Sequence, residues 1–346
     1  MMGLGEGSSS SFRDYEFTFE SYLQDPGQTE VVSHSESNGE LDSQSLSESI
    51  AVFQKENGRT YHAYRAGSYH FPNDPTEAER LDEQHAMLQF VMGGRNYLAP
   101  LSHVKPPQRI LDIATGTGAW AIEMGDEFPE SEITGTDLSP IQPEYVPPNV
   151  RFFVEDSADE WDYCHNFDYI HARMTVGCWS DYRSQVLAQA FAHLNPGGYF
   201  EAQEINGILL SDDHTIPPYC PIVQWTDEIN AASKQAHRDV TFAPLLKGWM
   251  EKAGFVDVHE HVFKIPLNGW PIDSRLKHIG MLWQRNMLNG LSAFSLGLLS
   301  RFRGRTKEEI ELELVGVRRD LFDPRMHAYQ RFYVVWGRKP MEGECT

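Results

Sequence analysis

The sequence predicts a doubly wound α/β fold, in which a mostly parallel sheet of seven strands has helices on both faces. Three observations support this. Short apolar runs alternate with segments of helical periodicity from about residue 80 to 205, and strands that alternate with helices build a parallel sheet. An apolar run from Arg109 enters a glycine-rich turn that a helix follows. A second strand-like run ends in Asp137, about 20 residues after that turn.

The predicted strands cover residues 110–113, 132–136, 150–154, 167–171, 199–204, 256–265 and 332–337. The predicted helices cover residues 75–92, 119–127, 182–194, 222–235 and 242–252. Residues 266–325 are expected to form a helical insertion before the last strand, and the last two strands are expected to pair antiparallel and close the sheet.

The glycine-rich turn predicts a cofactor that contains adenosine. Gly116 and Gly118 let the backbone approach a ligand closely, and the carboxylate of Asp137 can accept hydrogen bonds from both ribose hydroxyls. The alternative for Asp137 is an ordinary turn or helix-capping acid. The glycine spacing also fits NAD or FAD. However, Asp112 would repel a pyrophosphate at this turn and attract a cation, which favours S-adenosylmethionine, a ligand with an ammonium and a sulfonium.

Eight motifs between residues 57 and 340 carry a resemblance to a known family. They are residues 61–74 (YHAYRAGSYHFPND), 79–82 (ERLD), 111–120 (LDIATGTGAW), 135–143 (GTDLSPIQP), 146–150 (VPPNV), 167–173 (FDYIHAR), 194–198 (LNPGG) and 333–340 (YVVWGRKP). The chain resembles the class I S-adenosylmethionine-dependent methyltransferases, and more narrowly the fungal LaeA-like methyltransferases of secondary metabolism. This implies a Rossmann-like methyltransferase domain at residues 106–340, preceded by a helical cap at residues 51–105. In the family, an insertion such as residues 266–325 covers the active site as a lid.

The resemblance also implies which residues hold the adenosine. Asp137 would bind the ribose, and Leu138 would lie against the adenine. Asp156 would accept from the adenine amino group, with Ser157 and Ala158 beside it. The alternative for Asp156 is a solvated acid at a strand end.

Further residues are expected to lie beside the cofactor or the acceptor. Thr115 and Arg173 are assigned to cofactor binding, and Tyr69 belongs to a segment that would fold over it. The alternative for that segment is a set of core aromatic residues. His171 is the candidate general base, because an imidazole titrates near neutral pH, and its alternative is a packed structural histidine. Glu204 and His214 could orient a nucleophile.

The spacing of residues selects no general base with certainty, so O-, N- and C-methylation stay open. The acceptor is expected to be a hydrophobic small molecule, because the insertion carries large apolar side chains such as Trp270 and Trp283. Ordinary helical core is the alternative explanation of these side chains.

Composition limits the partners and the location of the protein. The net charge of −21 argues against direct nucleic-acid binding. Residues 1–50 hold ten acids and twelve serines, which predicts a disordered tail, with a protein-binding tail as the alternative. Four cysteines without paired spacing predict reduced thiols and no metal site. No signal peptide or membrane span is expected, so the location is expected to be cytoplasmic, with the nucleus as the alternative.

These observations favour an enzyme that methylates a small fungal secondary metabolite. One alternative is a nuclear regulator of the LaeA type. Another is a homologue that binds the cofactor without transferring a methyl group.

Overall fold

The computed structural model describes residues 53–344 of the chain, so the tail predicted at residues 1–50 lies outside the described residues. Seven strands form the central sheet: β3 (Arg109–Ile113), β4 (Glu132–Asp137), β5 (Val150–Val154), β6 (Phe167–Arg173), β7 (Leu194–Ile205), β8 (Val256–Pro266) and β9 (Tyr329–Arg338). Their spatial order is β5-β4-β3-β6-β7-β9-β8, and β9 runs in the direction opposite to the other six strands. The predicted fold class is therefore confirmed.

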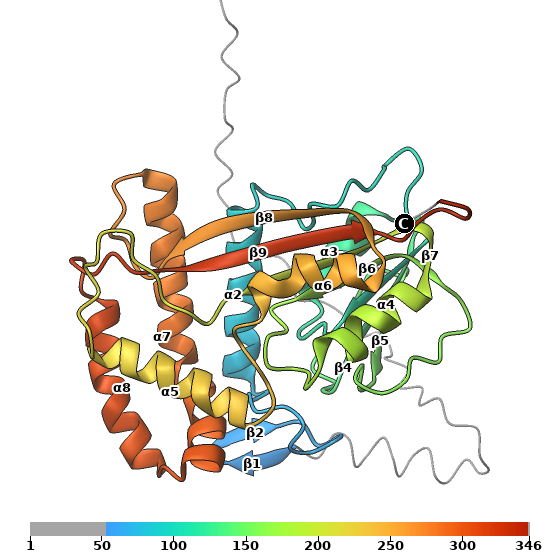
Figure 1. Ribbon diagram of the computed structural model, residues 1–346. Helices are drawn as coiled ribbons and strands as arrows, with labels where there is room; N and C mark the ends of the chain where they lie inside the picture. Colours follow the sequence, from blue (N-terminus) through green and yellow to red (C-terminus); the bar gives the residue numbers. More distant parts are fainter. Residues whose placement is uncertain (1–52, 345–346) are drawn as a thin grey trace, which may run out of the picture.

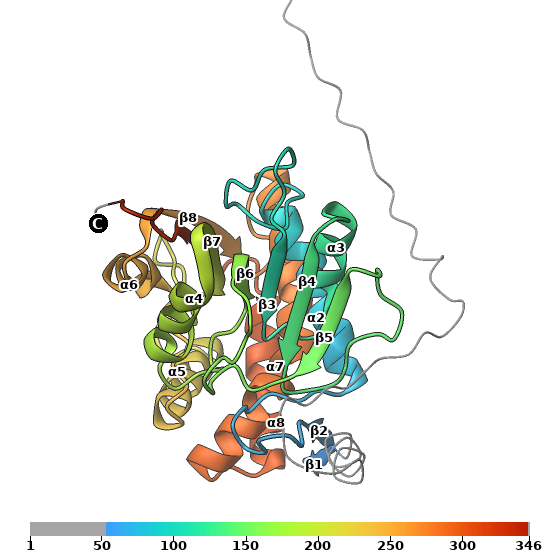
Figure 2. The same cartoon turned by 90° about the vertical axis from the view of Figure 1, so that its right-hand side faces the viewer.

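Helices cover both faces of this sheet (Figure 1, Figure 2). They are α2 (Pro75–Val91), α3 (Ala119–Glu127), α4 (Ala188–His193), α5 (Pro221–Gln235), α6 (Leu246–Ala253), α7 (Ser274–Arg303) and α8 (Lys307–Leu321). A π-helical turn (Arg183–Leu187) leads into α4, and a 3-10 turn (Ala243–Leu245) leads into α6.

Side chains along β3 alternate between two apolar layers. Leu111 and Ile113 pack in the layer that contains α4 and α6, whereas Ile110 packs in the layer of α3 with Trp120. Residues two apart on a strand point to the same face, so Asp112 shares the α3 layer with Ile110. The alternation thus places one buried carboxylate, only 3% exposed, near the carboxyl end of β3.

Several strand ends differ from their predicted positions because pairing extends them. β6 continues to Arg173, which pairs with Gln203 of β7. β7 begins at Leu194, so the LNPGG motif at residues 194–198 lies within its first residues. β9 begins at Tyr329, because that residue pairs with Pro266 at the end of β8.

A short hairpin that the sequence analysis did not predict precedes α2. Strands β1 (Gln54–Glu56) and β2 (Arg59–Tyr61) flank Asn57 and Gly58, whose φ angles are 53° and 84°. An Asn-Gly pair suits such a turn, since both residues tolerate positive φ. Figure 2 shows the hairpin beyond the carboxyl ends of the parallel strands. Residues 62–74, which we call the strap, lead from the hairpin to α2.

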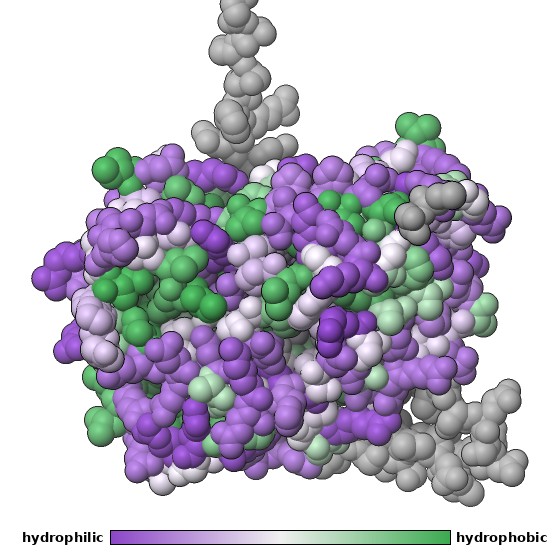
Figure 3. Space-filling view, viewed as in Figure 1, coloured by the Kyte–Doolittle hydropathy of each residue, from purple (hydrophilic) through white to green (hydrophobic). Residues whose placement is uncertain are grey.

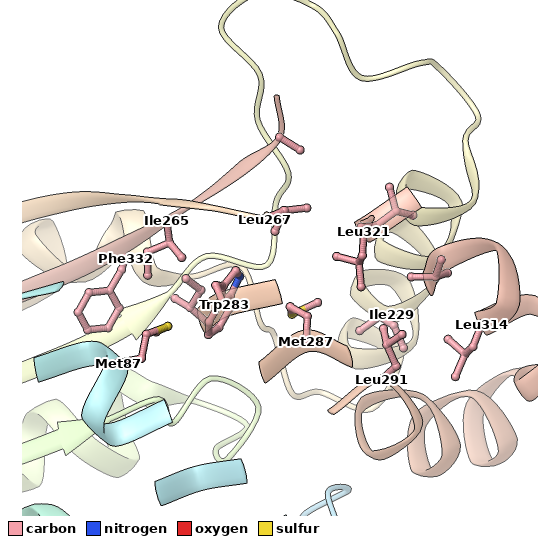
Figure 4. Packing of buried hydrophobic residues seen from close by; sticks show 14 of the residues in the cluster. Met87, Ile229, Ile265, Leu267, Trp283, Met287, Leu291, Leu314, Leu321 and Phe332 are labelled. Carbon is pink, nitrogen blue, oxygen red and sulfur yellow. The ribbon is translucent and has the colours of Figure 1, made fainter. Parts of the chain in front are cut away.

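The predicted insertion at residues 266–325 is helical and consists mainly of α7 and α8. α7 packs against α2 and α5, and α8 packs against α5 and α7, in a core that also includes apolar residues of β8 and β9. Trp283 is 3% exposed in this core, beside Met87 and Phe332 (Figure 4), and its indole N–H donates to Oε1 of Gln330 at 3.0 Å. The expected lid position of Trp283 is not observed, because the apolar face of α7 packs inward.

Polar side chains cover much of the face shown in Figure 3, with an apolar patch near α5. A hollow beside α5 is lined by Ile208, Leu209 and Ile216 of the segment before that helix and by mostly polar residues of α5 itself. None of the described helices is both long and apolar enough to span a bilayer.

Candidate active site

A cleft lies where the parallel strands end, bounded by the sheet, α2 and the strap. Ten of the predicted site residues line it: Tyr69, Asp112, Thr115, Gly116, Asp137, Leu138, Asp156, Ser157, His171 and Arg173. Gly118 and Ala158 lie outside its lining. Parallel strands present their carboxyl ends at one edge of a sheet, which is where ligands of such folds bind.

The two glycines of the turn have different roles. Gly116 has a φ of 63° and donates its N–H to Oδ2 of Asp137 at 2.9 Å, while its carbonyl accepts from Nε2 of Gln142 at 2.7 Å. Gly118 has a φ of 80°, and a Cβ atom there would lie 2.4 Å from the ring of Phe152. Gly116 therefore borders the cleft, whereas Gly118 permits close packing of the turn on β5.

Asp112 and His171 form a buried pair. They are direct neighbours across β3 and β6, and Nδ1 of His171 lies 2.8 Å from Oδ1 of Asp112. The imidazole is fully buried and stacks on Trp120 with ring centroids 3.7 Å apart. Burial lowers the pKa of His171, so a neutral ring donates to the carboxylate. The hydroxyl of Thr115 also donates to Asp112.

Asp137 is held by the backbone on both of its oxygens. Oδ1 accepts from the N–H of Ser139 and Oδ2 from that of Gly116, each at 2.9 Å. Burial, with the charge of Asp112 adding to it, raises the pKa of Asp137 to about 6. Each carboxylate oxygen can accept a second hydrogen bond, so Asp137 can still receive ribose hydroxyls.

The acid at the end of β5 belongs to a turn as well as to the cleft. Oδ1 of Asp156 accepts the N–H of Ala158 at 3.0 Å, so that N–H is already bonded within the protein. Ser157 is 7% exposed, and its carbonyl accepts from the indole of Trp161 at 3.0 Å. Asp156 and Ser157 line the cleft and can contact a ligand, whereas Ala158 lies outside the lining and bonds to Asp156.

Arg173, at the end of β6, belongs to a buried polar chain. One of its terminal nitrogens, Nη2, lies 2.5 Å from Nδ1 of His85 on α2. Nε2 of His85 lies 2.9 Å from Oε1 of Glu123 on α3. Burial lowers the pKa of Arg173 to about 10, which leaves the guanidinium charged at neutral pH.

The strap forms the outer wall of the cleft. The rings of Tyr69 and Phe71 meet edge to face at 5.2 Å, and both line the cleft. Nδ2 of Asn73 donates to Oγ of Ser139 at 3.1 Å, which ties the strap to the segment after β4. Asp74 caps α2 by accepting from the N–H of Glu77. These contacts place the predicted upstream segment over the cleft.

Sequence reasoning missed several polar residues of the cleft and its wall. Among them are Glu77, His85, Glu123 and Gln142. Gln142 lies inside one of the eight motifs, so a signal existed for it. His85 and Glu123 lie on two helices and meet only in the folded chain.

Glu77 is a buried acid at the cleft wall. Its Oε1 receives the guanidinium of Arg80, from Nε at 3.0 Å and from Nη2 at 2.5 Å. Among the described residues, its Oε2 has no hydrogen-bond partner.

Glu204 acts on the loop after β6. Its carboxylate accepts from the N–H groups of Thr175 at 2.9 Å and Val176 at 3.1 Å. This fixes the loop that supplies Cys178 and Trp179 to the cleft. His214 lies outside the lining, as do all residues of α7 and α8.

The charges around the cleft fit S-adenosylmethionine. Five carboxylates line it, those of Glu77, Asp112, Asp137, Glu155 and Asp156, against one guanidinium, that of Arg173. This excess of negative charge attracts a sulfonium and repels a pyrophosphate. Within residues 53–344, no group of three or more His, Cys, Asp or Glu side chains could hold a metal ion.

Comparison with known proteins defines the class of this protein. Residues 84–260 match a family described as a methyltransferase domain. The chain is 40% identical over 297 residues to methyltransferase pytC of Aspergillus terreus, which covers 86% of this chain and 91% of that protein. It is 34% identical to the secondary metabolism regulator LAE1 of Cochliobolus heterostrophus, over 83% of this chain and 95% of that protein. The chain therefore belongs to the fungal LaeA-like methyltransferases, which use S-adenosylmethionine.

Two further comparisons complete the picture. The protein-methionine methyltransferase laeA of Emericella nidulans is 30% identical, over 84% of this chain and 77% of that protein. Among solved structures, a phosphoethanolamine N-methyltransferase of Haemonchus contortus is similar, with a TM-score of 0.44, 16% identity and coverage of 86% of this chain and 73% of that chain.

Proposed function

We propose that this enzyme transfers the methyl group of S-adenosylmethionine to a small, largely apolar metabolite. The observation that supports this best is the composition of the cleft. Four of its five acids lie at or near the strand ends, while apolar and sulfur-containing side chains of the strap and of the segment after β6 line another part of it, namely Tyr69, Phe71, Met174, Cys178 and Trp179. Pockets for apolar ligands combine such walls with few polar groups.

In this proposal the cofactor supplies a methyl group bound to a sulfonium. The protein aligns the two ligands and excludes water, which accounts for much of the acceleration of such a displacement. Asp137 accepts the ribose hydroxyls, Leu138 contacts the adenine, and Asp156 accepts from its amino group. Thr115 and Gly116 border the ligand. The strap closes the cleft through Tyr69.

We assign His171 a positioning role in preference to that of a base. Its Nδ1 is bonded to Asp112, and its ring is covered by Trp120. A base must reach the proton that it removes. Replacement of His171 by Gln should therefore weaken binding of the cofactor without a change in the pH dependence of methyl transfer.

Metabolite profiles test the proposed acceptor class. A strain that lacks the gene should accumulate a compound lighter by one methyl group than the product of the parent strain. Reintroduced wild-type protein should restore the product, and the Asp137→Ala variant should restore much less. An unchanged profile in the deletion strain would contradict the proposal.

A second candidate acceptor is a protein methionine, supported by the position of Met174. This residue lines the cleft directly after Arg173 and has a φ of 55°. A thioether can attack the methyl group with its own lone pair. The bond from the methyl carbon to the donor sulfur then breaks, and the product is a sulfonium, so no base is needed. One relative carries the name protein-methionine methyltransferase.

Peptide mass spectrometry tests this second candidate. Incubation with S-adenosylmethionine should add one methyl group to the peptide that contains Met174, but not to the peptide that contains the exposed Met281. The Met174→Leu variant should stay unmodified. Absence of the added methyl in wild-type protein that binds the cofactor would leave the metabolite as the acceptor.

The relatives named as regulators support a regulatory role as an alternative to biosynthesis. In that case the acidic tail would serve a protein partner, and the protein would enter the nucleus. Cytoplasmic fluorescence of a tagged full-length chain would favour the biosynthetic role.

A further inference from the structure

Arg173 has an unused hydrogen-bonding group at the cleft. It contributes the one guanidinium or ammonium group among the described lining residues. Nη2 is bonded to His85, whereas Nη1 is buried and has no hydrogen-bond partner among residues 53–344. A buried cation with unbonded donors is costly unless an anion approaches it. The cleft should therefore receive a ligand with a negative group at this position.

The protonation state of His85 follows from its neighbours. A guanidinium has donors and no acceptor, so Nδ1 of His85 must accept from Arg173, and Nε2 must carry the hydrogen. Nε2 lies 2.9 Å from Oε1 of Glu123, which is an ion-pair distance, although the two atoms are not aligned for a hydrogen bond. Burial and the charge of Arg173 lower the pKa of His85, which keeps it neutral. Glu123 and His85 thus hold the guanidinium in one orientation.

The opposite charge lies close by in the sheet. Asp112 is the direct neighbour of His171 across β3 and β6, and Arg173 follows His171 by two residues on the same face. Asp112 has three percent exposure and lines the same cleft. Asp112 and Arg173 thus place an anion and a cation in the lining of one cleft. This pair matches a ligand with both an ammonium and a carboxylate, that is, an α-amino acid group.

We propose that Arg173 binds the carboxylate at the amino-acid end of the cofactor, while Asp112 faces its ammonium. His85 and Glu123 are positioning residues that orient Arg173. This inference rests on the proposed function, because it assigns charges to the two ends of the same ligand.

Decarboxylated S-adenosylmethionine isolates the contribution of Arg173. It keeps the adenosine, the sulfonium and the amine, and lacks only the carboxylate. In calorimetry, Arg173→Met should weaken the binding of S-adenosylmethionine by roughly 10- to 150-fold, the range for a hydrogen bond to a charged group. Its affinity for the decarboxylated ligand should equal that of the wild-type protein. Arg173→Lys, which keeps the charge, should recover part of the difference.

Two matched comparisons distinguish recognition from loss of structure. Asp137→Asn should weaken both ligands alike, because both carry the ribose. His85→Leu and Glu123→Gln should reduce the preference for the carboxylate-bearing ligand less than Arg173→Met does, with unchanged affinity for the decarboxylated one.

Three outcomes have distinct meanings. If Arg173→Met weakens both ligands equally, or weakens neither, the inference is wrong while cofactor binding stands. If a carboxylate preference persists in Arg173→Lys and Arg173→Met alike, another residue binds the carboxylate and the inference is also wrong. If the wild-type protein binds neither ligand, the proposed function fails, and the inference fails with it.

Discussion

Asp137 accepts the backbone N–H groups of Gly116 and Ser139 and borders the cleft, which is the basis for its proposed role in ribose binding. We expect Asp137→Ala to weaken binding of S-adenosylhomocysteine by about 1.5–3 kcal/mol, the cost of losing hydrogen bonds to a charged group. The melting temperature should fall as well, because the N–H groups of Gly116 and Ser139 lose their acceptor. Calorimetry and thermal unfolding measure the two effects, and unchanged affinity would contradict the ribose assignment.

The raised pKa of Asp137 predicts a dependence of binding on pH. The ionised carboxylate accepts hydroxyl protons best, so affinity for S-adenosylhomocysteine should rise as the pH rises through about 6. The stability of the ligand-free protein should change in the opposite direction. Burial disfavours the ionised form of Asp137 in the folded state. The free energy of unfolding should therefore fall as the pH rises from about 3.9, the ordinary pKa of an aspartate, to about 6. Asp137→Asn should remove both dependences.

The two glycines of the turn should respond differently to a methyl group. Gly118→Ala should cost about 2–5 kcal/mol in the free energy of unfolding, since it combines a positive φ with a clash against Phe152. The new methyl group of Gly116→Ala meets no atom closer than 3.7 Å. This variant should therefore lose only about 1–2 kcal/mol of the free energy of unfolding, and its main effect should be weaker binding of the ligand. Denaturant unfolding of both variants checks this. Similar losses of stability would show that Phe152 can move aside.

The side chains that sequence could and could not predict differ in a physical way. Asp112 and Asp137 lie at or next to the carboxyl ends of their strands, within about 20 residues of the glycine-rich turn. The local sequence pattern therefore predicted that both line the site. His85 and Arg173 are far apart in sequence and meet because α2 packs against the carboxyl end of β6. No local periodicity specifies such a contact, and the polar chain through Glu123 became visible only in the folded protein.

Helix α7 packs in the apolar core with α2 and α5, and none of its residues lines the cleft. Trp283→Ala should therefore lower the free energy of unfolding by about 3–5 kcal/mol, because it opens a cavity beside Phe332 and leaves Gln330 without its donor. Met281→Ala, at an exposed position of the same helix, should change it by less than about 0.5 kcal/mol. A Trp283 variant that kept its stability and lost only methyl transfer would restore the lid interpretation.

The sequence of the hairpin β1–β2 contains a turn signal that the sequence analysis did not use. Its strands have three residues each, too few for a clear alternation. The Asn57-Gly58 pair nevertheless suits its turn. Contacts far along the chain then hold it, as when Lys307 donates to the carbonyl of Asn57 at 2.9 Å.

The chain should tolerate removal of its tail but not of its strap. A protein that begins at Phe53 should keep its melting temperature and its affinity for S-adenosylhomocysteine, because the acid- and serine-rich composition of residues 1–50 disfavours packing. A protein that begins at Pro75 should lose that affinity, because Tyr69, Phe71 and Asn73 line the cleft. Loss of affinity in the longer protein would show that the tail contributes to the site.

The mostly parallel sheet and its closing antiparallel pair of strands were the most predictable features of the whole molecule. Strands alternating with helices leave few arrangements for a parallel sheet. The placement of α7 and α8 was harder, because a long apolar helix pattern fits a lid and a core equally well. Their packing with α2 and α5 places these helices in the core, and no local sequence pattern predicts that packing.

The unbonded polar atoms at the cleft predict that the stability of the protein depends on the supply of the methyl donor. In the described chain, Asn73 Oδ1, Glu77 Oε2 and Arg173 Nη1 are buried without hydrogen-bond partners. A ligand that bonds to such atoms stabilises the folded protein in proportion to the logarithm of its excess over Kd. Starvation for the methyl donor should then shorten the half-life of the protein, measured after translation is blocked, and Arg173→Met should make that half-life insensitive to starvation.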